Sequence, residues 1–192
     1  MNPNPQDPSA PKVIALCGSL RAGSHTRKAL DLAIEGAKKG GAEVTLVELS
    51  GLKLPPFDDG PSKEDPEVVR WKELVKAADG LLIGTPVYHD SYGGMLKNAL
   101  DFLYLELADK VAGLIAVGGG RVGQGQALEH LRAVLREPNT WVLPRQVVIP
   151  SSKEAFDENG ALKDKETVTR LGMLGMELVA RCKQLRPKKR AP

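Results

Sequence analysis

The sequence has little of what builds metal centres, disulfide frameworks or nucleophile elbows. It contains two cysteines and three histidines in 192 residues, and Cys17 and Cys182 stand far apart in the chain. Neither residue type has the spacing of metal ligands, and two distant cysteines without a secretory signal are expected to stay reduced. The Gly-x-Ser-x-Gly motif of a nucleophile elbow is also absent. We therefore expect no metal site and no catalytic side chain of this kind.

Long hydrophobic runs are missing as well. The apolar run Val111–Val117 is among the longest in the chain, and it is far too short to span a bilayer. Residues 1–8 have neither the basic region nor the apolar core of a signal peptide. We therefore expect a cytoplasmic protein that does not bind membranes.

The chain has little net charge, and the small excess lies in its ends. The charge is +3 at pH 7, and the four cations of residues 186–192, offset by Asp7, account for all of it. Because residues 12–185 are neutral, the chain offers no broad basic face for nucleic acid. We interpret residues 12–185 as one domain, residues 1–11 as a disordered tail and residues 186–192 as a basic tail.

Apolar runs typical of strands alternate with helical patterns along the chain. The expected strands are 12–18, 43–48, 80–84, 111–118 and 141–149, the last of them interrupted by Pro144. The expected helices are 26–39, 67–78, 94–104, 125–136 and 164–185. This alternation predicts an α/β fold with a doubly wound, mostly parallel sheet of five strands and helices on both faces.

The loop Gly18–Thr26 joins the first expected strand to the first expected helix. A loop in this place presents backbone N–H groups and the positive end of a helix dipole to an anion. Its side chains add three hydroxyls and one guanidinium, from Ser19, Ser24, Thr26 and Arg21. Such a set suits a phosphate monoester, which has several acceptor oxygens and about two negative charges.

Three kinds of phosphate ligand are candidates for a loop in this position. A P-loop for nucleoside triphosphates requires a lysine where Ser24 stands. The dinucleotide fingerprint is absent from this loop, and its spacing occurs only at Gly118–Gly123, which follows the fourth expected strand and is a weak match when it stands alone. A single phosphate on a flat ring system fits best, because loops 85–94 and 118–125 also follow strands and would meet it at the same edge of the sheet.

Three motifs resemble those of the NADPH-dependent FMN reductases, a flavodoxin-like family. The segment Gly18-Ser19-Leu20-Arg21, continued by Gly23-Ser24 and Thr26, resembles the first motif. Residues Thr85–Asp101 look like the second motif, and Gly118–Gly120 resembles the third. The resemblance implies a flavodoxin-like sheet with strand order 2-1-3-4-5.

By this resemblance, ten residues would bind FMN. Ser19, Arg21, Ser24 and Thr26 would hold its phosphate. The other six would line its ring, largely through backbone groups: Pro86, Val87, Tyr88, His89, Gly119 and Gly120. Many members have Glu-Tyr-Asn where this chain has Val87-Tyr88-His89, which leaves backbone contacts in place but leaves the role of the His89 side chain open.

The resemblance also implies an activity and an assembly. Bound FMN would take a hydride from NADPH or NADH at N5 and pass electrons, in a ping-pong sequence, to free flavin, a quinone, an azo compound or a metal ion. The protein itself would contribute no catalytic side chain. A homodimer or homotetramer would form through the helix around Gly94–Tyr104, with Lys97 and Asp101 at the interface. Two alternatives remain: a flavodoxin-type electron carrier that does not oxidise NADPH, and a binding module that has lost FMN.

Overall fold

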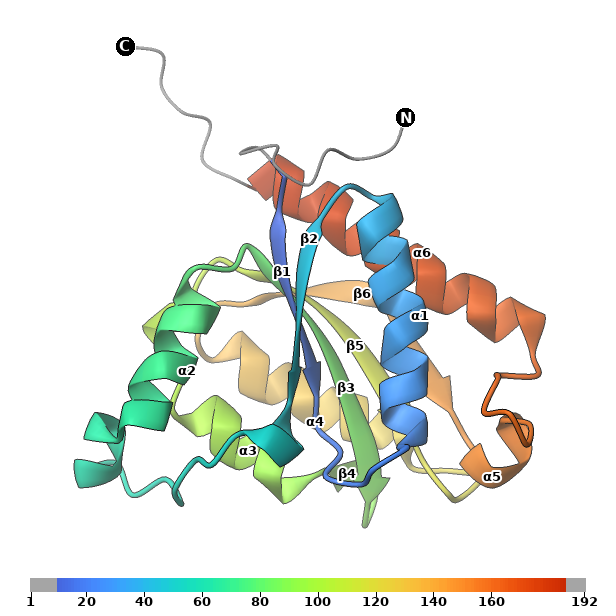
Figure 1. The fold of residues 1–192 in the computed structure, drawn as a ribbon, viewed down its shortest axis with the longest axis horizontal. Helices are drawn as coiled ribbons and strands as arrows, with labels where there is room; N and C mark the ends of the chain where they lie inside the picture. The colour runs from blue at the N-terminus through green and yellow to red at the C-terminus, as the bar shows by residue number, and fades with distance from the viewer. Residues whose placement is uncertain (1–9, 186–192) are drawn as a thin grey trace.

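The computed structural model describes residues 10–185. Five parallel strands form its sheet in the order β2-β1-β3-β5-β6 (Figure 1). Their bounds are Lys12–Cys17 for β1, Glu43–Glu48 for β2, Gly80–Tyr88 for β3, Val111–Val117 for β5 and Trp141–Ile149 for β6. Counted among these five strands, the predicted order 2-1-3-4-5 is confirmed. The tails predicted at both ends fall almost wholly outside the described residues.

Helices cover both faces of the sheet (Figure 1). On one face lie α1 (His25–Lys39) and α6 (Lys165–Leu185). On the other lie α2 (Pro66–Lys76), α3 (Gly94–Asp101) and α4 (Gln124–Arg136). Alternate β1 residues enter the two cores, with Val13 and Ala15 facing α1 and α6, and Ile14 and Leu16 facing the other three helices. No helix within residues 10–185 is both long and apolar enough to cross a membrane.

Some local structure differs from the prediction. Strand β3 runs four residues beyond 84 and turns back into the short antiparallel strand β4, Ser91–Tyr92. His89 and Asp90 at this turn have φ values of 47° and 56°, the left-handed conformation that suits a two-residue hairpin. Helix α3 ends at Asp101, and the chain continues through a 3-10 turn, Leu105–Leu107.

Three further short elements were not predicted. They are the 3-10 turns Leu49–Gly51 and Pro61–Glu64 and the helix α5, Ser152–Ala155. Each is three or four residues long, so none carries a hydrophobic period that a sequence pattern could reveal.

Pro144 interrupts β6 as expected, and the structure shows how the interruption is accommodated. Between Ala112 and Leu114 of β5 the register on β6 jumps from Val142 to Gln146, so the intervening residues bulge out. Arg132 of α4 donates to the carbonyl oxygens of Leu143 (2.7 Å) and Pro144 (3.3 Å) and to Gln146 Oε1 (2.9 Å). The guanidinium thus replaces ladder partners that the bulge has removed.

Helices α1 and α6 touch through glycines. A Cβ atom on Gly175 would lie 2.0 Å from the carbonyl oxygen of Ala33, and one on Gly36 would lie 2.0 Å from that of Gly172. Only residues without side chains permit this approach. The contact fixes α1, whose N-terminus carries the first loop, against the C-terminal helix.

We predict that Gly175→Ala lowers the free energy of unfolding by about 1–3 kcal/mol, because the new methyl group meets backbone that must move. Gly172→Ala is the matched control on the same helix, since a Cβ there meets nothing within 4 Å, and it should stabilise by up to about 1 kcal/mol. Urea unfolding followed by circular dichroism measures both. Equal effects of the two substitutions would contradict the close helix contact.

Candidate functional site

The carboxyl ends of β1 and β3 are joined where the first loop begins. Gly18 N donates to the carbonyl oxygen of Gly84 at 2.7 Å. Ser19 is buried, with 3% of its surface exposed, and its Oγ accepts from Arg21 N at 3.3 Å. Ser24 caps α1, because its Oγ accepts from Thr26 N at 3.1 Å. The loop is therefore held in shape by its own hydroxyls.

The first loop has positive character at the start of α1. The first turn of α1 contains no acidic residue, and within residues 10–185 no carboxylate lies within 4 Å of the Arg21 guanidinium. The helix dipole adds to the positive potential. Burial first, and then the cations Lys28 and Arg21, lower the pKa of the His25 ring below its ordinary value, which disfavours a positive charge on that ring.

The second loop is the hairpin of β3 and β4. The Thr85 hydroxyl is fully buried, accepts from Gly93 N at 3.2 Å and donates to the carbonyl oxygen of Pro86 at 2.9 Å. Beyond the hairpin turn, Ser91 Oγ lies 3.1 Å from Nδ1 of His130 on α4. These bonds fix both strands of the hairpin at the edge of the sheet.

The third loop, Gly118–Gly123, is bonded on one side to the turn after β6. Ser152 N donates to the Gly118 carbonyl at 2.9 Å, and Ser151 N donates to the Gly120 carbonyl at 2.8 Å. Gln124, only 4% exposed, also donates from Nε2 to the Gly120 carbonyl at 2.9 Å. The Gln124 side chain fills the space that a Cβ on Gly118 would take, coming within 2.3 Å of it.

These bonds orient the peptide planes of the third loop. In a trans peptide the C=O and the following N–H point in opposite directions. Because the Gly118 carbonyl is directed at the turn after β6, the Gly119 N–H is directed the other way, toward β3, which flanks β5 on its other side. Within residues 10–185 that N–H has no protein acceptor. It is a donor available to a ligand.

The three loops enclose one cavity of about 400 Å³, a size common for small-molecule sites, which span roughly 300–1000 Å³. It is lined by Ser19, Arg21, Gly23, Ser24, His25, Thr26, Pro86, Val87, Tyr88, Val117, Gly119, Gly120, Ser152 and Lys153. One end therefore offers hydroxyls and cations, and the other offers hairpin and glycine backbone. Such a donor set fits a flat molecule with a phosphate at one end.

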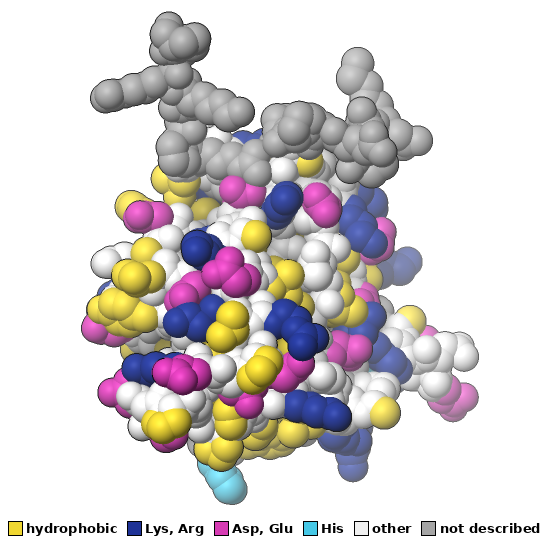
Figure 2. All heavy atoms as spheres, turned by 60° about the vertical axis from the view of Figure 1, so that its left-hand side comes forward, with side chains coloured by type: hydrophobic (Ala, Val, Ile, Leu, Met, Phe, Trp, Pro, Cys, Tyr) yellow, Lys and Arg dark blue, Asp and Glu magenta, His cyan; other side chains and the backbone are white. Residues whose placement is uncertain are grey.

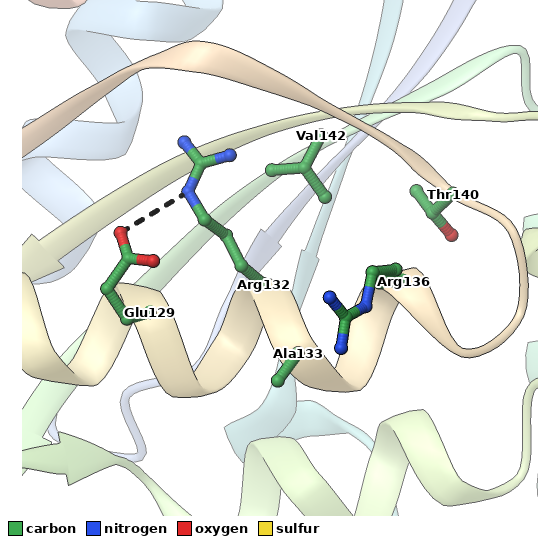
Figure 3. A pocket seen from close by; sticks show the side chains of 6 residues that line it. All are labelled: Glu129, Arg132, Ala133, Arg136, Thr140 and Val142. Atoms are coloured by element: carbon green, nitrogen blue, oxygen red, sulfur yellow. Dashed lines mark ion pairs between the residues drawn. The ribbon is translucent and has the colours of Figure 1, made fainter.

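A second hollow, of about 450 Å³, lies between α4 and the start of β6 (Figure 3). Figure 3 shows Arg132 directed at Glu129, with which it pairs at 3.6 Å. The same guanidinium binds the carbonyls of the β6 bulge. Arg132 is therefore already engaged, and none of the three loops lines this hollow, so it is the weaker candidate for a ligand site.

Comparison with known proteins agrees with the loop geometry. Residues 11–154 match the family of NADPH-dependent FMN reductases. An NAD(P)H-dependent FMN reductase of Pseudomonas aeruginosa is 37% identical over 158 residues, covering 80% of this chain and 85% of that protein. An NAD(P)H:quinone oxidoreductase of Solanum tuberosum is 33% identical over 191 residues, covering 92% and 95%. The chain belongs to the NADPH-dependent FMN reductase family.

A solved structure agrees with this membership. The flavoenzyme NAD(P)H:acceptor oxidoreductase FerB from Paracoccus denitrificans superposes with a TM-score of 0.75 at 25% identity, covering 91% of this chain and 98% of that one. The resemblance drawn from the three sequence motifs is thereby confirmed.

The structure brings nine of the ten residues predicted to bind FMN to the walls of this one cavity. The tenth, His89, lies at the tip of the hairpin and is not among the lining residues. Its left-handed turn conformation is what places it there. The roles of all ten as ligands remain predictions.

Sequence reasoning missed the wall that follows β6. Ser152 and Lys153 line the cavity from this turn, and Gly23, His25 and Val117 are the other lining residues that were not predicted to bind FMN. One signal was available, because the turn follows a parallel strand and so must lie at the same edge of the sheet as the other three loops. No motif marked it.

We predict that Gln124→Met, which keeps the side-chain volume but removes the bond to Gly120, loosens the third loop. Loss of one hydrogen bond of about 0.5–1.5 kcal/mol should speed exchange roughly two- to tenfold at the amides of Gly118, Ser151 and Ser152, whose N–H groups are bonded at this loop. Hydrogen–deuterium exchange measures the rate. Gln126→Met on the exposed side of the same helix is the control, and equal acceleration by both variants would refute the role assigned to Gln124.

Proposed function

We propose that this protein is an FMN-dependent NAD(P)H oxidoreductase. It takes electrons from NADPH or NADH and passes them to a small acceptor such as free flavin, a quinone, an azo compound or a metal ion. The observation that carries the proposal is the cavity itself. The Arg21 guanidinium, which has no carboxylate partner in the described chain, lies at one end, and the Gly119 N–H, which has no protein acceptor there, lies at the other. Family membership and relatives named as FMN reductases and quinone oxidoreductases support it.

At the phosphate end, we assign four ligands. Ser19, Ser24 and Thr26 bring hydroxyls to the start of α1, and Arg21 brings a guanidinium without a carboxylate partner in the described chain. Charge-assisted bonds of this kind are shorter and about twice as strong as neutral ones. The phosphate end therefore supplies much of the affinity.

At the ring end, backbone does the positioning. Pro86, Val87 and Tyr88 form one wall, and Gly119 and Gly120 form the facing one. Bound FMN supplies the centre that accepts a hydride and later releases electrons. The Gly119 N–H, fixed in direction before the ligand arrives, stabilises negative charge at the ring edge without reorganisation. We assign no acid, base or nucleophile to the protein, and we retain His89 as a contact from the hairpin tip.

We also propose a cytoplasmic homo-oligomer, a dimer or tetramer, built on the surface around α3. Met95, Tyr104 and Leu105 are exposed there, Leu105 to 80%. Lys97 and Asp101 pair with each other along the same helix. Figure 2, which turns the α2 and α3 side of Figure 1 forward, shows hydrophobic side chains interspersed with charged ones on this face. A domain spanning residues 12–185 would carry both this surface and the FMN site.

A flavodoxin-type carrier is the competing function, and reduction by NADPH separates the two. We expect the full-length protein loaded with FMN to lose its visible flavin absorption when NADPH is added without air, and to regain it when a quinone follows. Dithionite is the control that shows the bound flavin can be reduced. If dithionite bleaches the protein and neither NADPH nor NADH does, the protein is a carrier and the oxidoreductase proposal is wrong.

For the assembly, we predict that Leu105→Glu shifts the protein toward monomer, because a charge at an apolar contact must be desolvated without a partner. Analytical ultracentrifugation over a concentration series measures the shift. Met176→Glu, at a half-exposed site on the opposite face, is the control and should leave the mass unchanged. A wild-type chain that sediments as a monomer throughout would overturn the proposal.

A further inference from the structure

The turn after β6 is held against the cavity from two sides. Ser151 N and Ser152 N bind the carbonyls of the third loop, as described above. At the other end of α5, the Phe156 ring stacks on the His25 ring with centroids 4.4 Å apart and planes 8° from parallel. His25 is the first residue of α1. The turn therefore bridges the third loop and the phosphate end of the cavity.

Lys153 stands on this bridge. It lines the cavity together with Arg21 and Ser24, and it also borders a neighbouring hollow that contains Asp157 and Glu158. Despite those acids, within residues 10–185 no carboxylate lies within 4 Å of its ammonium group. Lys153 is an exposed residue that lines the cavity, and the bonds of Ser151 N and Ser152 N hold the turn that carries it, so its side chain can reach a ligand there.

The charge at this end of the cavity is incomplete with Arg21 alone. A phosphate monoester brings about two negative charges at neutral pH, and Arg21 supplies one full positive charge beside the partial charge of the α1 N-terminus. Among the described lining residues the other basic groups are His25 and Lys153, and the pKa of His25 is lowered. A second full charge can come from the turn after β6.

We propose that Lys153 is a second cation for a phosphate monoester in this cavity, acting beside Arg21. The inference rests on the proposed function, which puts two such groups within reach: the 5′-phosphate of FMN and the 2′-phosphate of NADPH. Both have the same charge and the same oxygen acceptors, so Lys153 suits either.

The test compares ligands that differ only in the phosphate. Dissociation constants of the full-length protein, stripped of flavin, are measured for FMN and for riboflavin by quenching of flavin fluorescence. We expect Lys153→Gln to weaken FMN about fivefold, the effect of an exposed ion pair of about 1 kcal/mol, and to leave riboflavin unchanged. Lys163→Gln is the matched control, because Lys163 borders the neighbouring hollow but does not line the cavity. This substitution should change neither the FMN nor the riboflavin dissociation constant.

Kinetics identify which phosphate is bound. If Lys153→Gln leaves FMN affinity intact but raises KM for NADPH about fivefold and not KM for NADH, the lysine serves the donor's 2′-phosphate. If neither FMN affinity nor the NADPH preference changes, or if riboflavin weakens as much as FMN, the proposal is wrong. Arg21→Ala is the reference, expected to weaken FMN at least about tenfold. A wild-type chain that binds no FMN overturns the proposed function and this inference together.

Discussion

Parallel pairing of β1, β3 and β5 is the constraint on which the site depends. Parallel strands end at the same edge of the sheet, so three loops far apart in the sequence meet there. The pairing also continues past the ends of the strands: Gly18 N binds the Gly84 carbonyl, and Gly118 N binds the Ile149 carbonyl. These bonds therefore fix the direction of the peptide planes where each loop leaves the sheet. The direction of the Gly119 N–H follows from the same strand hydrogen bonds.

Much of the fold could be predicted from the sequence, because its main strands and helices are long and their apolar periods are clear. The ends of β1, β2, β6 and α1 fall within about one residue of the prediction. The extension of β3 and the short α5 could not be predicted, since both are held by tertiary contacts. The β3 hairpin depends on the buried Thr85 hydroxyl and on α4, and α5 depends on carbonyls of the third loop.

The site was partly predictable for a similar reason. Hydroxyls and a guanidinium at Gly18–Thr26 carry recognisable chemistry in their side chains, and the structure brings them together. The turn after β6 contributes two backbone N–H groups that bind the third loop and one lysine that lines the cavity. None of these groups can be recognised from the sequence. His89 shows the opposite case, a residue that a motif predicts at the site and that does not line the cavity. The motif places it beside ring-lining residues, but its distance from the cavity depends on a left-handed turn that Val87-Tyr88-His89 alone does not reveal.

A chain with no net charge over residues 12–185 can still hold a dianion, because what matters is the charge within about a Debye length, some 8–10 Å, of the ligand. Several carboxylates of the described chain pair with lysines and arginines on the surface, and no acid lies in the first turn of α1. The α1–α6 glycine contact fixes the helix axis, and with it the direction of the dipole at the first loop. The phosphate site proposed at this edge of the sheet therefore depends on local charge at the first loop, the Arg21 guanidinium and the N-terminus of α1, and not on the net charge of the protein.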